Sequence, residues 1–523
     1  MRKFLLASVA TLGTGGLMGA AFAQAPAAPV GAPSQGQVAY PLANPTAYVN
    51  DNNNYQAPAL PGPLANPTPG TIVIHMNGKI QTTFQSEWGS VDTRTFAPPA
   101  AGSLNAVLGG NGTGTVKLNP YALDSFARLY FGADAMATNG LRYGAGLEIR
   151  ENFTGQIGSN TSTNASGYTC TETLYVRRAF TYFAGENWGI VRLGQADGVI
   201  GIFDNGVTTG QALINGLNGG DNQNVSGAGV PFFFLATQGA EYGNTKVVYL
   251  SPQIAGFDFG VQWAPNFSNG YGIGTGNPVN ASLSGAGIGT GLGCSSTGTS
   301  GCPNLASGPG ILDGSKGTNQ VVLGARYQGT FAGVGLLAYA AWEQSGHVHY
   351  TGLGTPLTAA GQTILGTTTV PGSTFNGQYD GLNFGSGGIA ATFAGFTFSA
   401  NAIGGRLNGQ GALAPQGGAP EVAYILGLKY VTGPLTLDIQ AEEAWYQGNV
   451  VLTGVSQRRA RAITFGGTYN VAPGFQVFAE YLWEDTQQAQ NNFLTGAVGT
   501  AAGASLNNNL KSQGFLIGNV INF

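Results

Sequence analysis

The sequence predicts an all-β protein: an antiparallel transmembrane β-barrel of about 16 strands, with short periplasmic turns and long extracellular loops. Three observations predict it, namely a low charge, a high glycine content and strictly alternating side chains. Charged residues make up only 8% of the 523 residues, whereas soluble proteins carry about 25%. The 87 glycines disfavour a helical protein, since each glycine costs about 1 kcal/mol relative to alanine inside a helix.

The first residues have the features of a secretory signal peptide. Arg2 and Lys3 form a positive start, residues 4–18 are moderately apolar, and Ala21-Phe22-Ala23 is a small-residue cleavage site. We therefore expect residues 1–23 to be removed on export. Beyond them, no apolar run reaches the roughly 18 residues that a membrane-spanning helix needs.

Residues 24–70 are rich in Pro, Ala and Asn, and the hexapeptide Pro-Leu-Ala-Asn-Pro-Thr occurs at 41–46 and again at 63–68. Prolines at this spacing cannot donate to a sheet ladder. We expect a linker or periplasmic arm over 24–70, in which a flexible spacer and a wall-contacting anchor are the alternatives. The β-barrel domain then covers residues 71–523.

From Thr71 onward, apolar and polar residues alternate. Residues 141–150 place Leu141, Tyr143 and Leu147 on one face and Arg142, Glu148 and Arg150 on the other, which is the period of a strand. Residues 321–328 and 435–442 repeat the arrangement. The predicted strands lie near 71–87, 123–136, 140–153, 172–186, 188–195, 240–250, 255–266, 319–330, 333–345, 385–394, 396–405, 421–432, 434–447, 460–470, 474–486 and 510–523.

The connections between these strands alternate between tight turns, as at 137–139 and 330–332, and long polar loops, as at 196–239 and 267–318. This alternation is typical of outer-membrane barrels. A soluble β-sandwich also alternates, but low charge, an even strand count and aromatics near strand ends favour the barrel. The aromatics expected at the membrane interface are Trp88, Tyr182, Trp188, Trp263, Trp342, Trp445 and Trp483.

Four segments resemble the Gram-negative general porins. Residues 177–183 (RRAFTYF) and 188–195 (WGIVRLGQ) resemble the fourth and fifth strands of that family. Residues 249–257 (YLSPQIAGF) resemble one of its turns, and 469–475 with 479–481 its penultimate turn and strand. The chain also ends in Phe523 with apolar residues at alternate positions, as porins do. The resemblance covers about 71–523.

The resemblance implies a homotrimer in outer-membrane lipid, with a third loop, here 196–239, folded into each pore. It implies a channel for passive diffusion of ions and small hydrophilic solutes, filtered by size and charge, and neither an enzyme nor a cofactor-binding protein. The alternative is a non-conducting barrel that acts as adhesin, anchor or receptor through its loops. No basic stretch suggests nucleic acid, and the sequence does not decide between cation and anion preference.

Period-two alternation points five arginines into the lumen, and the resemblance implies that an acidic third loop lies opposite them. The expected constriction residues are Arg128, Arg142, Arg150, Arg177 and Arg192 on strands and Asp197, Asp204 and Asp221 in the loop. Alternatively, Arg142, Glu148 and Arg150 pair only with one another, and the aspartates are solvated loop acids. Alternation places Arg178 outward, near a rim or in the subunit interface. Lys246, Arg326 and Lys429 are expected to be further luminal charges.

Cysteine and histidine content gives little sign of other chemistry. Cys294 and Cys302 flank a short Ser/Thr/Gly segment and form a candidate disulfide, although pairing of either with Cys170 is an alternative. No metal site is predicted, because there is no CxxC motif and His347 and His349 lack a carboxylate neighbour. Hydrolase, phosphate-loop and dinucleotide-binding motifs are also missing from the sequence.

Overall fold

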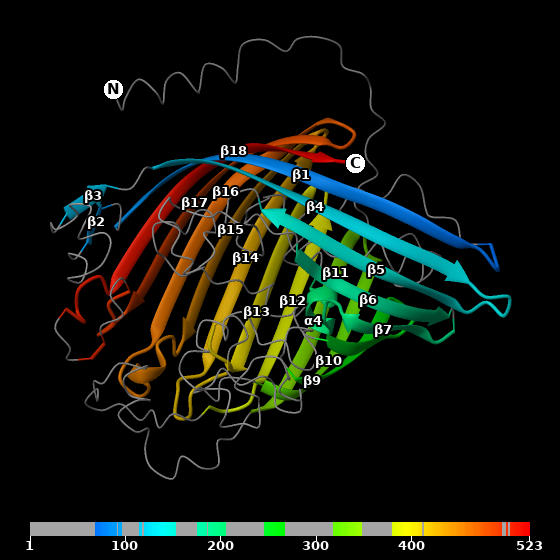
Figure 1. Ribbon diagram of the computed structural model, residues 1–523, viewed down its shortest axis with the longest axis horizontal. Coiled ribbons are helices and arrows are strands. Elements are labelled where there is room, and N and C mark those ends of the chain that lie inside the picture. The colour runs from blue at the N-terminus through cyan, green and yellow to red at the C-terminus, as the bar shows by residue number, and fades with distance from the viewer. Residues whose placement is uncertain are drawn as a thin grey trace, which may run out of the picture. The chain divides into compact units, whose positions relative to one another are not determined.

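The computed structural model describes residues 68–90, 93–96, 114–117, 120–152, 175–185, 187–204, 245–266, 317–347, 379–409, 413–493, 498–499 and 503–523. Sixteen antiparallel strands form one closed barrel, in which each strand pairs with the barrel strands that precede and follow it along the chain. The last strand pairs with the first and closes the ring (Figure 1). The predicted fold class is therefore confirmed.

The barrel strands correspond one by one to the predicted segments. They are β1 (Ile72–Gly89), β4 (Tyr121–Met136), β5 (Arg142–Asn152), β6 (Tyr175–Gly185), β7 (Gly189–Gln195), β8 (Thr245–Leu250), β9 (Phe257–Asn266), β10 (Gly317–Phe331), β11 (Val334–His347), β12 (Asn383–Phe393), β13 (Phe396–Arg406), β14 (Glu421–Thr432), β15 (Leu435–Tyr446), β16 (Arg458–Ala472), β17 (Phe475–Gln488) and β18 (Asn509–Asn522). One hairpin was not expected: β2 (Thr93–Phe96) and β3 (Gly114–Lys117) form a separate two-stranded sheet in the first long connection.

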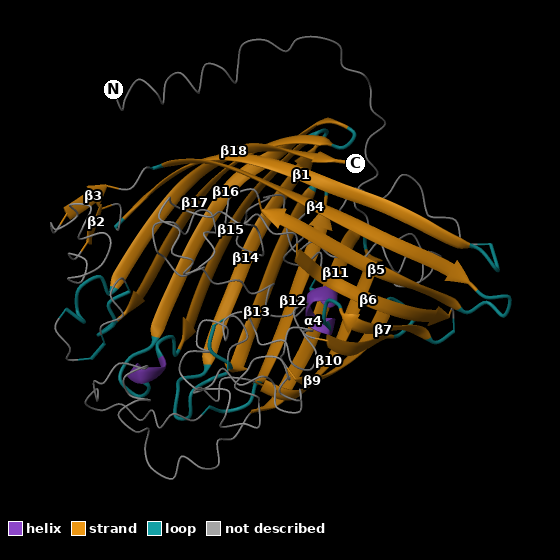
Figure 2. Ribbon diagram, viewed as in Figure 1, coloured by secondary structure: helices purple, strands orange, loops and turns teal. Residues whose placement is uncertain are grey.

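In the described part of the connections lie two short helices, α4 (Val199–Phe203) and the 3-10 helix η4 (Val450–Leu452) (Figure 2). None of the helices in the described ranges has the length and apolar character of a membrane-spanning helix. Residues 1–67, which include the expected signal peptide and nearly all of the expected arm, lie outside the described residues.

Several short turns share one geometry. Ala255-Gly256, Ala332-Gly333 and Ala394-Gly395 each join two strands, and both residues of each pair have positive φ, close to 50° for the alanine and 82–89° for the glycine. Two successive left-handed residues are typical of a type I′ turn, whose twist matches the flanking strands. Glycine adopts this conformation without strain, whereas alanine does not.

The two faces of the wall differ in the way that alternation predicts. On β14 and β15, Leu426, Leu428 and Ile439 face outward and are 43–49% exposed in the isolated chain, whereas Asp438 and Gln440 face inward and are buried. The outer face thus offers an apolar surface to lipid, and the inner face carries the polar side chains.

Charged residues on the outer face of β15–β17 gather near the rim that carries the long loops. Arg459 forms an ion pair with Glu443, and Arg461 forms one with Asp485. Each arginine also lies over the ring of a tryptophan, Trp445 or Trp483. Such pairing at the rim limits the cost of placing charge toward lipid, which is highest at mid-bilayer and small near the interface.

Four of the tryptophans expected at the interface, Trp88, Trp188, Trp263 and Trp342, are exposed on the isolated barrel. Tyr182 is an exception, and the expectation for it was wrong. Its side chain is fully buried on the inner face and its hydroxyl donates a hydrogen bond to Asp134. A tyrosine suits either face, because it has an apolar ring and a polar tip.

Candidate functional site

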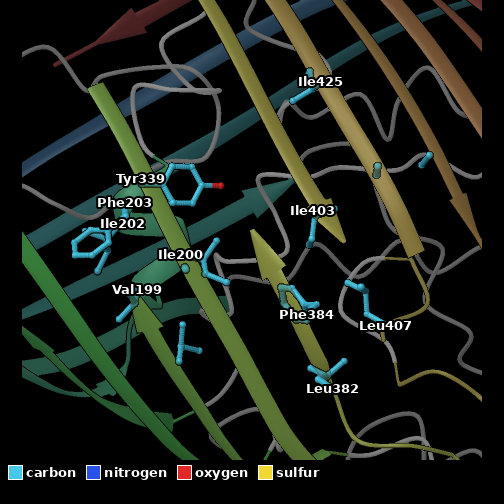
Figure 3. Packing of buried hydrophobic residues seen from close by; sticks show 14 of the residues in the cluster. Val199, Ile200, Ile202, Phe203, Tyr339, Leu382, Phe384, Ile403, Leu407 and Ile425 are labelled. Atoms are coloured by element: carbon cyan, nitrogen blue, oxygen red, sulfur yellow. The ribbon is translucent and has the colours of Figure 1, made fainter. Parts of the chain in front are cut away.

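The third long connection, which we call loop 3, joins β7 to β8 and is described from Ala196 to Asp204. This segment turns to the inner side of the barrel, where α4 contacts β9, β10 and β11. The sequence of α4, VIGIF, is entirely apolar, and every residue of this helix is buried. Figure 3 shows these side chains close to apolar residues of β11 and of the adjoining strands β12 and β13, among them Tyr339, Phe384 and Ile403.

The wall under α4 is shaped by two inward-facing glycines, Gly260 of β9 and Gly324 of β10. A Cβ atom at either position would lie 2.7 Å from Cγ1 of Val199 and 3.0 Å from the ring of Phe203. These distances are shorter than side chains tolerate. The two glycines therefore let the helix pack directly against the backbone of β9 and β10.

Polar side chains of the wall hold the backbone of the same segment. Lys246 Nζ donates to the carbonyl of Ala196 at 2.7 Å. The amide of Val199 donates to Gln262 Oε1 at 2.9 Å. Arg326, which also pairs with Asp258, donates to the carbonyl of Ile202 at 3.3 Å. Wall residues thus satisfy backbone groups at both ends of α4 that a short helix leaves without partners.

A buried ion-pair triad connects the start of loop 3 to β5 and β6. Arg178 is fully buried and pairs with Glu148, and its Nη2 atom lies 2.7 Å from Asp197 Oδ1. Removing one partner from such a group leaves an uncompensated buried charge, which costs about 3–5 kcal/mol. The triad therefore couples the position of loop 3 to the barrel wall.

Burial changes the protonation of the two loop aspartates. It raises the pKa of the Asp204 carboxyl well above its ordinary value, and the nearby Asp197 raises it further. Burial also raises the pKa of Asp197, although Arg178 opposes this effect. Asp204 is therefore the described loop 3 group most readily held in its neutral form.

The inner wall divides into a basic and an acidic part. On the strands from β1 to β8, buried basic side chains outnumber the buried acids Asp134 and Glu148; the basic ones are Lys79, Arg128, Arg142, Arg178, Arg192 and Lys246. Buried acidic side chains line β11 and β14–β17: Glu343, Glu421, Asp438, Glu442, Glu480 and Glu484. The acidic wall was not predicted as a site, although the alternation in 435–442 already placed Asp438 and Glu442 on the polar face.

The structure places five of the predicted constriction residues inside the barrel. Arg128, Arg142 and Arg192 lie on the basic wall, and Asp197 and Asp204 lie at the two ends of the described loop 3 segment. Because both aspartates are only 1% exposed, the alternative that they are solvated loop acids is wrong. Lys246 and Arg326 face inward as expected.

Asp221, Cys170, Cys294 and Cys302 lie outside the described residues, as do the side chains of Arg150 and Arg177.

The outward orientation expected for Arg178 was wrong. Arg178 shares the inner face of β6 with Phe180 and Tyr182. In the pairing of β5 with β6, Glu148 lies opposite Arg178 and Ile149 opposite Val176, so the register skips Arg177. Such a bulge adds a residue and breaks the period of two. Aromatic residues at both parities of this strand made the apolar face ambiguous in the sequence.

A closed antiparallel barrel with an apolar outer face and a charged, inward-folded loop defines an outer-membrane β-barrel channel. The family model of the Gram-negative porins matches residues 100–489, about three quarters of the chain. The chain therefore belongs to the Gram-negative porin family, and its resemblance to that family is confirmed.

Several solved porins are similar in structure. An anion-selective porin from Comamonas acidovorans is 14% identical with a TM-score of 0.45, over 87% of this chain and 100% of that one. OmpT from Vibrio cholerae, in a trimer form, is 13% identical with a TM-score of 0.42, over 86% and 99%. A mutant of the Rh. blastica porin is 13% identical with a TM-score of 0.40, over 86% and 100%. No curated protein sequence matches the chain.

Proposed function

We propose that the protein lets ions and small hydrophilic solutes diffuse passively through a water-filled lumen that loop 3 narrows. The observation that carries this proposal is the inward-folded segment 196–204. It packs against the inner face of β9–β11 and is held by the Arg178 triad and by Gln262 and Arg326. A loop fixed inside a barrel reduces the cross-section open to solutes.

The proposed filter combines size with a transverse field. The basic wall from β1 to β8 faces an acidic wall on β11 and β14–β17. Ions and dipolar solutes can align in such a field, whereas an apolar solute must displace ordered water to enter. The acids across from the arginines come mainly from strands, because Asp197 is paired with Arg178 and burial raises the pKa of Asp204.

The remaining expectations are part of the same proposal. Residues 1–23 act as a cleaved export signal, residues 24–70 form a periplasmic arm or linker, and three copies assemble in the outer membrane, as the family resemblance implies. The function requires no catalysis and no cofactor. Loss of residues 1–23 from the mature protein, measured by N-terminal sequencing, tests the first point.

Liposome swelling tests the proposed function. Purified protein is reconstituted into liposomes, and entry of uncharged sugars of increasing size is followed by light scattering. A passive filter predicts rates that fall steeply with size and do not saturate with concentration. If folded protein admits not even the smallest sugar, the diffusion proposal is wrong, and a binding role of the loops is favoured.

A further inference from the structure

Small side chains line the inner face of β16. They are Ala460, Ala462, Thr464, Gly466 and Thr468. The two flanking strands, β15 and β17, carry acidic side chains that face the same way, so carboxylates lie on both sides of β16, whose inward side chains from Ala460 to Thr468 are all small.

The register places these carboxylates in two levels. Glu442 of β15 and Glu484 of β17 both lie opposite Ala462, and Asp438 and Glu480 both lie opposite Gly466. We name these four residues the acidic track. Because strands are spaced about 4.8 Å apart, the Cα atoms within one level are about 10 Å apart, and the two levels are separated by about 13 Å.

Within the described residues, the level nearer the long-loop rim contains carboxylate oxygens that accept no hydrogen bond. Glu442 is 5% exposed, and neither of its carboxylate oxygens has a hydrogen-bond partner within the described residues. Glu484 Oε2 accepts from Ser512 Oγ at 3.2 Å, but its Oε1 atom has no such partner there.

Two neutral side chains beside Glu442 also have buried polar atoms that make no hydrogen bond within the described residues. Gln440 and Thr464 are cross-strand partners that face inward and are at most 1% exposed. Their side-chain oxygens and the Gln440 amide nitrogen have no hydrogen-bond partner in the part of the chain that the structure describes. Buried polar groups are nearly always satisfied, by protein or by a bound molecule. This combination of carboxylate, amide and hydroxyl oxygens therefore suits a cationic hydrogen-bond donor.

Nearby basic residues are engaged elsewhere or act at the other level. Arg458 Nε donates to Gln488 Oε1 at 3.2 Å, and its guanidinium lies over the rings of Tyr446 and Phe493. Lys429 lies opposite Asp438, at the level farther from the long-loop rim. Among the described residues, neither Arg458 nor Lys429 is therefore paired with the upper level, Glu442 and Glu484.

We propose that the upper level of the acidic track binds small organic cations that carry ammonium groups, which makes cationic solutes a preferred substrate class of this porin. The proposal rests on the proposed channel function. The wide spacing fits a linear diammonium ion, which can place one end near each carboxylate, better than a chelated metal ion. Consistent with this, the described residues contain no group of acidic, histidine or cysteine side chains arranged to hold a metal ion.

Current block in planar bilayers tests the proposal. Putrescine, a linear diammonium ion, is added to one side while the potassium chloride current is recorded at pH 7, and succinate serves as a probe of similar length and opposite charge. We expect putrescine, but not succinate, to reduce the current. Because a hydrogen bond to a charged group contributes about 1.5–3 kcal/mol, Glu442→Gln should raise the half-blocking concentration about tenfold or more.

Glu443→Gln is the matched control, since Glu443 adjoins Glu442 on the same strand but faces outward. Its half-blocking concentration should equal that of the wild type. The inference is overturned if the wild type conducts but putrescine does not block it, or if Glu442→Gln and Glu484→Gln are blocked like the wild type. Absence of any potassium chloride current would instead contradict the proposed channel function.

Discussion

At the scale of single residues, Asp204 links the chemistry of loop 3 to pH. Its carboxyl is buried beside Asp197 at the end of α4, and its pKa lies well above the ordinary value of 3.8. An acid with a raised pKa in the folded state loses stabilisation as pH rises from its unfolded pKa to its folded pKa. The segment should therefore be held most firmly at low pH.

Hydrogen exchange tests this prediction. The amides of Ile202 and Asp204 donate to Gly198 and Ile200, so their protection factors report on α4. We expect protection to decrease as pH rises above 3.8 in the wild type and to vary much less in Asp204→Asn, whose side chain stays neutral. Identical pH dependence in both proteins would show that Asp204 is not the responsible group.

The alanines of the type I′ turns give a second prediction at this scale. Ala332 has a φ of 50°, a conformation that costs an L-residue about 1–2 kcal/mol. Ala332→Asn should therefore raise the unfolding free energy by roughly 0.5–1 kcal/mol, since asparagine tolerates this region better. Urea unfolding followed by gel mobility measures it. Gly333→Ala, in the same turn, should instead lower the unfolding free energy. If both substitutions change it in the same direction, the strain assigned to Ala332 is wrong.

The same scale shows where a sequence is ambiguous. Alternation correctly predicted the inward orientation of Arg128, Arg142 and Arg192, because their strands have one clearly apolar face. It failed for Arg178 and Tyr182, since β6 has aromatic residues at both parities and the register skips Arg177. The partners that make a buried arginine tolerable, Glu148 and Asp197, come from other segments, and no local pattern reports them.

At the scale of elements, the packing of α4 against the barrel wall depends on Gly260 and Gly324, which face loop 3. We expect Gly324→Ala to displace Val199 and Phe203 and to destabilise the barrel by about 1–3 kcal/mol, the usual cost of overpacking. Val199→Ala in the Gly324→Ala protein should recover much of this loss, because it removes the Cγ1 atom 2.7 Å from the new Cβ. Urea midpoints of the single and double variants measure the coupling, and simple additivity would contradict the proposed contact.

The ion-pair triad gives the corresponding electrostatic prediction. Arg178→Met should destabilise the protein by about 3–5 kcal/mol, since it leaves Glu148 and Asp197 buried without their shared partner. Combining it with Glu148→Gln and Asp197→Asn should restore a large part of the stability. If the triple variant is as unstable as Arg178→Met, packing rather than charge accounts for the loss.

At this scale the sequence was most informative about strands and least about loops. All the barrel strands were predicted, because each alternates over its length and ends at a turn. The β2–β3 hairpin was missed, since its four-residue strands are too short to show a period. The inward fold of loop 3 followed only from family resemblance, because its contacts with Gln262 and Arg326 join distant parts of the chain.

At the scale of the whole molecule, the proposed field crosses the lumen between a basic wall and an acidic wall. Among the acids, only those of loop 3 were predicted as constriction residues. The structure adds a wall of carboxylates from β11 and β14–β17, which becomes visible only when the barrel closes and brings strands of the two halves of the chain face to face.

Conductance of the purified protein in a planar bilayer across a salt gradient shows whether the chain forms an open channel. We predict stable, ohmic current steps that arrive in groups of three, together with a zero-current potential whose sign shows which wall dominates. The acidic track predicts a cation-selective sign that weakens in Glu442→Gln. Properly folded protein that inserts and yet passes no current would contradict the account of this chain as a diffusion channel.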